Sequence, residues 1–113
     1  ALFGVKVPDD ARGCLQDVHW SFGLVGYFPT YTLGNLYAAS FWSALKREMT
    51  NGDERMERGE FEPVLSWFND RVHRHGRMYT PRELCLRITG GDLSIEPLMA
   101  YLEGKLRGVY GTA

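Results

Sequence analysis

The sequence has no long apolar run and almost no excess of charge, and both absences narrow what the chain can be. No run approaches about 18 apolar residues, so the sequence predicts no membrane-spanning helix and no membrane partner. Thirteen basic residues against fourteen acidic ones leave a net charge of −1, so nothing indicates a nucleic-acid-binding surface. No charged and apolar leader ending in small residues is visible, and we therefore expect a cytoplasmic location without a secretion signal.

Cysteine and strand patterns are scarce as well. Cys14 and Cys85 stand far apart and form no Cys-x-x-Cys unit. Small secreted domains usually carry more cysteines, so we expect two buried thiols in a reducing compartment rather than a disulfide. No apolar alternation runs longer than a few residues, which argues against β-strands. The composition is 44% hydrophobic, so the chain is not disordered, and we expect a single domain over residues 1–113 with one modest core.

Helix signals occupy most of what remains. The sequence predicts helices over about 30–49, 60–75, 81–88 and 94–110, with a further short turn at 53–58. The first is the strongest, because its apolar side chains recur every three or four residues and Thr30 is a candidate N-cap. Thr80-Pro81-Arg82-Glu83 has the pattern of a capping box with proline at the first helical position. We therefore predict an all-α, bundle-like fold of four to five helices, with the 30–49 helix at its centre.

A long aromatic loop is expected between residues 13 and 30. The apolar period is lost there, and glycines, a proline and large aromatic side chains follow one another. Gln16, Asp17 and His19 fall within four residues of each other in this loop. An amide, a carboxylate and an imidazole beside aromatic rings are suited to holding a polar ligand in a mostly apolar cleft.

Each polar residue of this loop has a structural alternative. His19 could donate to a developing oxyanion or a substrate carboxylate, with Asp17 fixing its tautomer, or it could pin the loop through a backbone carbonyl. Gln16 could bind a peptide backbone or orient the imidazole, and Asp17 could simply cap a turn. Tyr27 and Tyr31 offer phenol donors to a ligand, or they could pack with their hydroxyls in water. The residues alone leave these alternatives open.

Two blocks of this segment resemble a known family. Gly13-x-x-Gln16-Asp17-x-His19-Trp20 and the block from Gly26 to Asn35 are similar to the C-terminal portion of the thermostable carboxypeptidase Taq family, which are His-Glu-x-x-His metallocarboxypeptidases. Weaker likeness continues from Phe61 to Tyr110. The resemblance implies a fragment of a larger helical metallopeptidase, whose parent removes C-terminal residues from peptides with zinc or cobalt.

The resemblance also implies roles for the loop residues. In the family the motif lies beside the substrate cleft, so we expect substrate-binding roles for five residues: Gln16, Asp17, His19, Tyr27 and Tyr31. His19 is the one candidate for transition-state stabilisation. One of the two tyrosines is expected to reach the site, but the resemblance does not say which.

The metal site of the family is missing from this sequence. There is no His-Glu-x-x-His, and the three histidines, His19, His73 and His75, include no pair four residues apart. We therefore expect that this chain by itself binds no catalytic metal and is inactive. Its expected partners are the peptide substrate and the upstream catalytic region of the same enzyme.

A different class of function is also open. Aromatic side chains at 20, 22, 27, 28 and 31 would form an apolar patch if no partner covered them. The chain would then be a helical module that self-associates as a homodimer, or a stand-alone peptide binder without catalysis.

Overall fold

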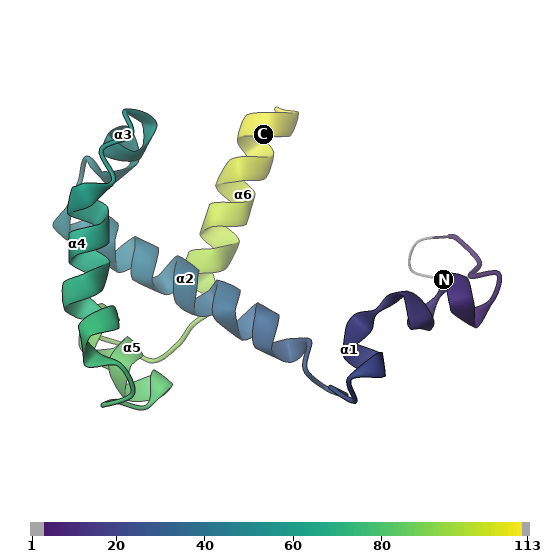
Figure 1. The fold of residues 1–113 in the computed structure, drawn as a ribbon. Coiled ribbons are helices and arrows are strands. Elements are labelled where there is room, and N and C mark those ends of the chain that lie inside the picture. The colour runs from purple at the N-terminus through teal and green to yellow at the C-terminus, as the bar shows by residue number, and fades with distance from the viewer. Residues whose placement is uncertain (1–3, 112–113) are drawn as a thin grey trace. The chain divides into compact units, whose positions relative to one another are not determined.

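The computed structural model describes residues 4–111, and in that range it holds helices and turns but no strand. Six α-helices and three short 3-10 turns follow one another, which confirms the predicted all-α class (Figure 1). The chain divides into two compact units, one ending at Thr32 and the other beginning at Leu33. The assignment of residues 1–113 to a single domain stays a prediction.

The first unit consists of short helical turns joined by glycine-rich bends. The turns are η1 (Asp10–Arg12), η2 (Cys14–Gln16) and α1 (Val18–Ser21). The carboxylate of Asp9 accepts the backbone N–H of Arg12 at 2.8 Å and so caps η1. The segment expected as a plain loop, residues 13–30, therefore contains η2 and α1. The Asp17 carboxylate caps α1, whereas η2 has no side-chain cap and is closed by backbone hydrogen bonds from Gln16 N–H to Gly13 and from Asp17 N–H to Cys14.

Helix α2 (Pro29–Glu48) matches the strongest predicted helix and begins one residue earlier than expected. Proline suits the first turn, because its missing N–H would have no helical partner there. Thr30 therefore lies inside the helix instead of capping it. Its hydroxyl donates to the carbonyl of Tyr27 at 2.6 Å and ties the first turn to the preceding segment.

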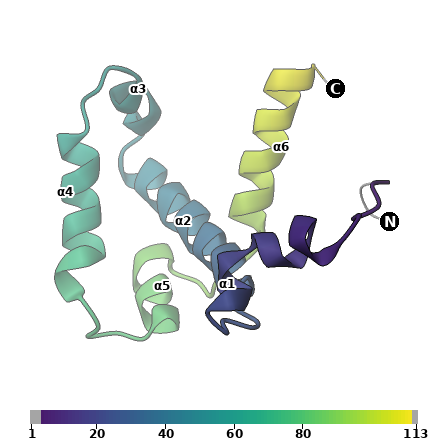
Figure 2. The same ribbon diagram turned by 45° about the vertical axis from the view of Figure 1, so that its right-hand side comes forward.

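The second unit continues through the remaining helices. They are α3 (Gly52–Glu57), α4 (Glu62–Arg71), the turn η3 (His73–His75), α5 (Pro81–Thr89) and α6 (Glu96–Tyr110). In both ribbon views α6 runs away from α4 and α5 along most of its length (Figures 1 and 2). No side chain of α6 is buried. None of the helices within residues 4–111 has the length and apolarity needed to cross a bilayer.

A small core lies around the C-terminal half of α2. Leu45 and Cys85 are completely buried, and Ala44 and Val64 are nearly so. Glu48, at the end of α2, accepts the indole N–H of Trp67 at 2.9 Å and the guanidinium of Arg71 at 2.8 Å. These two bonds link α2 to α4 beside the core.

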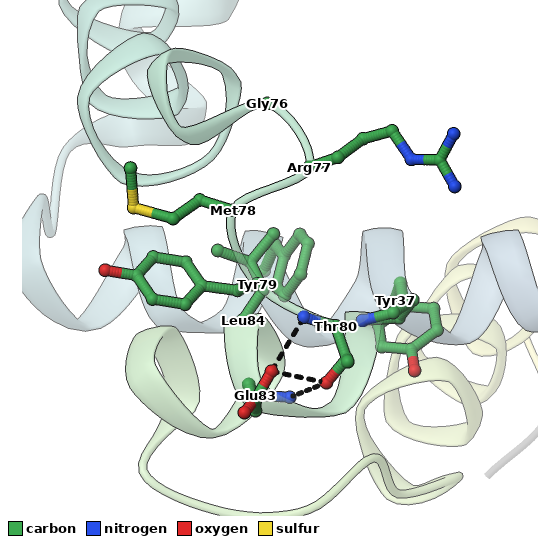
Figure 3. Close-up of a pocket in the computed structure, with 10 residues that line it drawn as sticks. Tyr37, Gly76, Arg77, Met78, Tyr79, Thr80, Glu83 and Leu84 are labelled. Atoms are coloured by element: carbon green, nitrogen blue, oxygen red, sulfur yellow. Dashed lines mark hydrogen bonds between the residues drawn. The ribbon is translucent and has the colours of Figure 1, made fainter.

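The start of α5 confirms the predicted capping box. The backbone N–H of Glu83 donates to the Thr80 hydroxyl oxygen at 3.3 Å, and the Glu83 carboxylate accepts the backbone N–H of Thr80 at 2.8 Å (Figure 3). The helix ends at Gly90, whose φ of 81° lies in the left-handed region that glycine adopts without strain. A side-chain cap therefore sets the start of this helix, and the left-handed backbone of Gly90 sets its end.

The two cysteines differ in environment. Both are free thiols, as expected, but only Cys85 is buried, whereas Cys14 is exposed. The expectation of two buried thiols was therefore wrong for Cys14. Cys14 lies in η2, a single turn in which no side chain is buried.

Candidate functional site

The imidazole of His19 is held by the carboxylate of Asp17. The Nδ1 atom of His19 lies 2.7 Å from Oδ1 of Asp17, and the same oxygen accepts the backbone N–H of His19 at 2.8 Å. Asp17 is therefore both the N-cap of α1 and the partner of the ring. From the sequence, these two roles of Asp17 were alternatives, and the structure combines them.

The other ring nitrogen of His19 meets a tyrosine twelve residues further along the chain. The Nε2 atom of His19 lies 2.9 Å from the hydroxyl oxygen of Tyr31, in the first turns of α2. An ionised Asp17 requires a proton on Nδ1, which leaves Nε2 of the neutral ring as an acceptor. The neutral imidazole therefore accepts a hydrogen bond from the hydroxyl of Tyr31. We call the chain of Asp17, His19 and Tyr31 the relay.

Aromatic side chains surround the relay. The ring of Tyr27 stacks on the imidazole of His19, with centroids 5.4 Å apart and planes inclined by 23°. The centroid of the Phe28 ring lies 5.1 Å from that of the imidazole, and the centroids of the Trp20 and Phe28 rings are 6.2 Å apart. Trp20 and Phe28 are both exposed, as expected of members of the apolar patch that the sequence predicted. No periodic signal in the sequence identifies Phe28 as a neighbour of the histidine.

The relay is accessible to solvent. The side chain of His19 is 22% exposed and that of Asp17 is 34% exposed, whereas Tyr31 is 52% exposed. Asp17 thus holds the imidazole through Nδ1, and the phenol of Tyr31 stays accessible to a ligand. A carboxylate, an imidazole and a phenol in this order can position a hydrogen-bonding group at the end of the chain.

The charge state of Asp17 follows from its hydrogen bonds. The backbone N–H of His19 donates to the carboxylate, and the imidazole donates as well, and these bonds hold the pKa of Asp17 below its ordinary value. Asp17 therefore remains ionised at neutral pH and keeps the imidazole in the Nδ1–H tautomer.

Gln16 does not join the relay through its amide nitrogen. Its Nε2 donates to the backbone carbonyl of Ala11 and so ties η2 to η1. The structure thus brings together Asp17, His19, Tyr27 and Tyr31, and it gives the amide nitrogen of Gln16 a local structural bond.

The described residues do not fit a catalytic divalent metal. Across residues 4–111, no three side chains from His, Cys, Asp and Glu come together as a ligand set. Only one imidazole and one carboxylate meet at the relay, whereas catalytic zinc takes three protein ligands. His73 and His75 lie in η3, where His73 stacks on Phe68.

Two open hollows lie within the second unit. One of about 500 Å³ lies between α2 and the segment from Gly76 to Leu84 (Figure 3). Its carboxylate, Glu83, is already bonded to Thr80 in the capping box, and Arg77 points away from it. The other, of about 800 Å³, lies between α2 and α6 and has mainly apolar walls. Neither hollow is lined by an imidazole, so the relay is the better candidate site.

Comparisons with known proteins agree with the motif at the relay. The sequence profile described as Carboxypeptidase Taq (M32) metallopeptidase matches residues 1–106. The chain is 49% identical over 108 residues to thermostable carboxypeptidase 1 of Thermus thermophilus, a match that covers 96% of this chain and 21% of that protein. It is 35% identical to the protein of the same name from Pyrococcus furiosus, over 92% of this chain and 21% of that protein.

A solved structure of a carboxypeptidase also matches this chain over most of its length. The crystal structure of the M32 carboxypeptidase from Deinococcus radiodurans R1 matches with a TM-score of 0.88 and 40% sequence identity. This match covers 96% of the present chain and 22% of that one. The chain thus spans about a fifth of the length of the relatives it matches.

Proposed function

Because the chain belongs to the carboxypeptidase Taq (M32) metallopeptidase family, we propose that it forms the C-terminal, substrate-groove part of a metal-dependent carboxypeptidase. The parent enzyme releases C-terminal amino acids from peptides in the cytoplasm. The relay carries the proposal, because it places a phenol hydroxyl at the open end of a fixed hydrogen-bond chain within the family motif.

The residues of the groove have separate tasks in this proposal. Tyr31 contacts the C-terminal carboxylate or the scissile carbonyl of the peptide, and its hydroxyl donates to that oxygen when protonated His19 donates to the phenol oxygen in turn. Tyr27 supports the imidazole through its ring and lines the groove with Phe28. Of the two tyrosines, Tyr31 is therefore the one that we assign to the substrate. Gln16 lines the groove through its carbonyl end, while its amide nitrogen stays with Ala11.

The divalent metal, zinc or cobalt, is held by another part of the parent polypeptide in this proposal. The described residues contain no ligand set for it, so this chain contributes recognition and orientation of the substrate. A turnover of peptides by the purified 113-residue chain with added zinc or cobalt would contradict this division.

A chimaeric enzyme tests the proposed function. The matched segment of the Thermus thermophilus carboxypeptidase is replaced by this chain, and release of C-terminal amino acids is measured. We expect an active chimaera, and a loss of about 100-fold in kcat/KM for Tyr31→Phe, as when one transition-state hydrogen-bond donor is removed. Tyr110→Phe, on the exposed end of α6, serves as the matched control. Full activity of the Tyr31→Phe chimaera would refute the assignment of this residue.

A second candidate function is a helical module that self-associates as a homodimer or binds peptides without catalysis. Exposed side chains in the first unit favour it, because Phe22 and Val25 are each 75% exposed. Sedimentation equilibrium of the chain over a wide concentration range tests it. A single monomeric species at every concentration would exclude self-association.

A further inference from the structure

The imidazole of His19 is faced by one carboxylate and three aromatic rings. Asp17 comes from the cap of α1, and Tyr27 and Phe28 come from the segment that leads into α2. Tyr31, from α2 itself, meets the ring edge-on and holds Nε2 through its hydroxyl. These contacts fix the plane of the ring, and they are compatible with both of its charge states.

In the neutral state the proton of each bond has a defined place. Nδ1–H of His19 donates to Asp17, and the hydroxyl of Tyr31 donates to Nε2. The single hydroxyl proton of the phenol is engaged in the hydrogen bond to the imidazole, so the phenol oxygen offers only lone pairs to a ligand. Tyr31 then suits a ligand that donates a hydrogen bond.

In the protonated state the last bond reverses. A proton taken from solvent resides on Nε2, and Nε2–H donates to the oxygen of Tyr31 at the same distance. The hydroxyl proton of Tyr31 turns outward and becomes a donor. The ring itself does not move, since Nδ1–H keeps its bond to Asp17 and the stacked ring of Tyr27 also favours a cation.

We infer that protonation of His19 reverses the hydrogen-bonding polarity of Tyr31, so that the relay binds a carboxylate with the uptake of one proton. The inference rests on the proposed function in that the C-terminal carboxylate of a peptide is the intended ligand. Asp17 acts as a positioning residue, because its ionised oxygen excludes the Nε2–H tautomer of the neutral ring.

The test uses the intact chain with benzoate as the probe and benzamide as its neutral counterpart. Nitrogen-15 spectra of labelled histidine report the protonation of each ring nitrogen, and the signal that His19→Gln removes identifies the residue. We expect neutral His19 to carry its proton on Nδ1. We expect benzoate to bind about tenfold more tightly at pH about 5.5 than at pH about 8.5, in line with one charge-assisted hydrogen bond.

Added benzoate should also raise the protonated fraction of His19 at a fixed pH at which the nitrogen-15 spectra show both charge states. Benzamide should do neither. Tyr31→Phe should abolish the pH dependence of benzoate binding, whereas Tyr110→Phe should leave it intact. A neutral His19 with its proton on Nε2, benzoate binding of equal strength at both pH values, or no benzoate binding would each overturn the inference.

The result is separable from that of the chimaera. Peptide release by the chimaera together with pH-independent benzoate binding would overturn the proton linkage and leave the proposed function standing. An inactive chimaera together with proton-linked benzoate binding would support the linkage and count against the carboxypeptidase assignment.

Discussion

Truncation of Leu45 tests whether the small core described above stabilises the second unit. Leu45 lies on α2 and is completely buried. Its Cδ2 atom is only 3.1 Å from the position that a Cβ on Gly52 would occupy, so the backbone at the start of α3 closes against it. The site therefore has little freedom to collapse when atoms are removed.

The magnitude follows from the atoms lost. Leu45→Ala removes three carbon atoms, which at about 0.8 kcal/mol for each buried methylene costs about 2.4 kcal/mol. The residual cavity raises the loss in the free energy of unfolding to about 3 kcal/mol. Because folded domains have a total stability of only about 5–15 kcal/mol, and few side chains are buried among the described residues, this loss is a large share.

Urea unfolding followed by the helical circular-dichroism signal measures this loss. Leu65→Ala is the matched control, since Leu65 lies on α4 and is 61% exposed. The control should change the free energy of unfolding by less than about 0.5 kcal/mol. A loss below about 1 kcal/mol for Leu45→Ala, or equal losses for both variants, would refute the argument that this residue anchors the core.

Three further predictions concern the capping box and the thiols. Thr80→Ala should lower the free energy of unfolding by about 1 kcal/mol, measured in urea, because the N–H of Glu83 loses its acceptor. The pKa of Glu83 is depressed, chiefly because the backbone N–H of Thr80 donates to its carboxylate. This stabilisation is complete above the ordinary pKa of a glutamate and is lost as the pH falls through the lower folded-state value, so the urea midpoint should fall on the acid side. Ellman's reagent should modify Cys14 in native buffer and Cys85 only in denaturant, because only Cys14 is exposed.

Each of these predictions has its own control. Thr50→Ala, at an exposed turn, should leave the urea midpoint nearly unchanged. Glu83→Gln should reduce the acid dependence of the midpoint, and an undiminished dependence would show that other carboxylates dominate it. Equal rates of modification of both thiols in native buffer would contradict the burial of Cys85.

Local chemistry explains what the sequence predicted correctly. The α2 helix follows from apolar side chains at helical spacing, and the start of α5 follows from the capping box of Thr80 and Glu83. Asp17 and His19 are only two residues apart, so their pairing could be proposed from the sequence without knowledge of the fold. The family was likewise visible, because Gly13-x-x-Gln16-Asp17-x-His19-Trp20 is a continuous stretch of chain.

Contacts between distant residues were decided only by the tertiary structure. The choice of Tyr31 over Tyr27 as the partner of Nε2 depends on how the chain turns through Gly23 and Gly26, which both have positive φ. The bond of Gln16 to Ala11 and the exposure of Cys14 depend in the same way on the path of the backbone. Sequence spacing determines which side chains share a helix face, whereas the direction of a turn determines which hydroxyl reaches an imidazole twelve residues earlier.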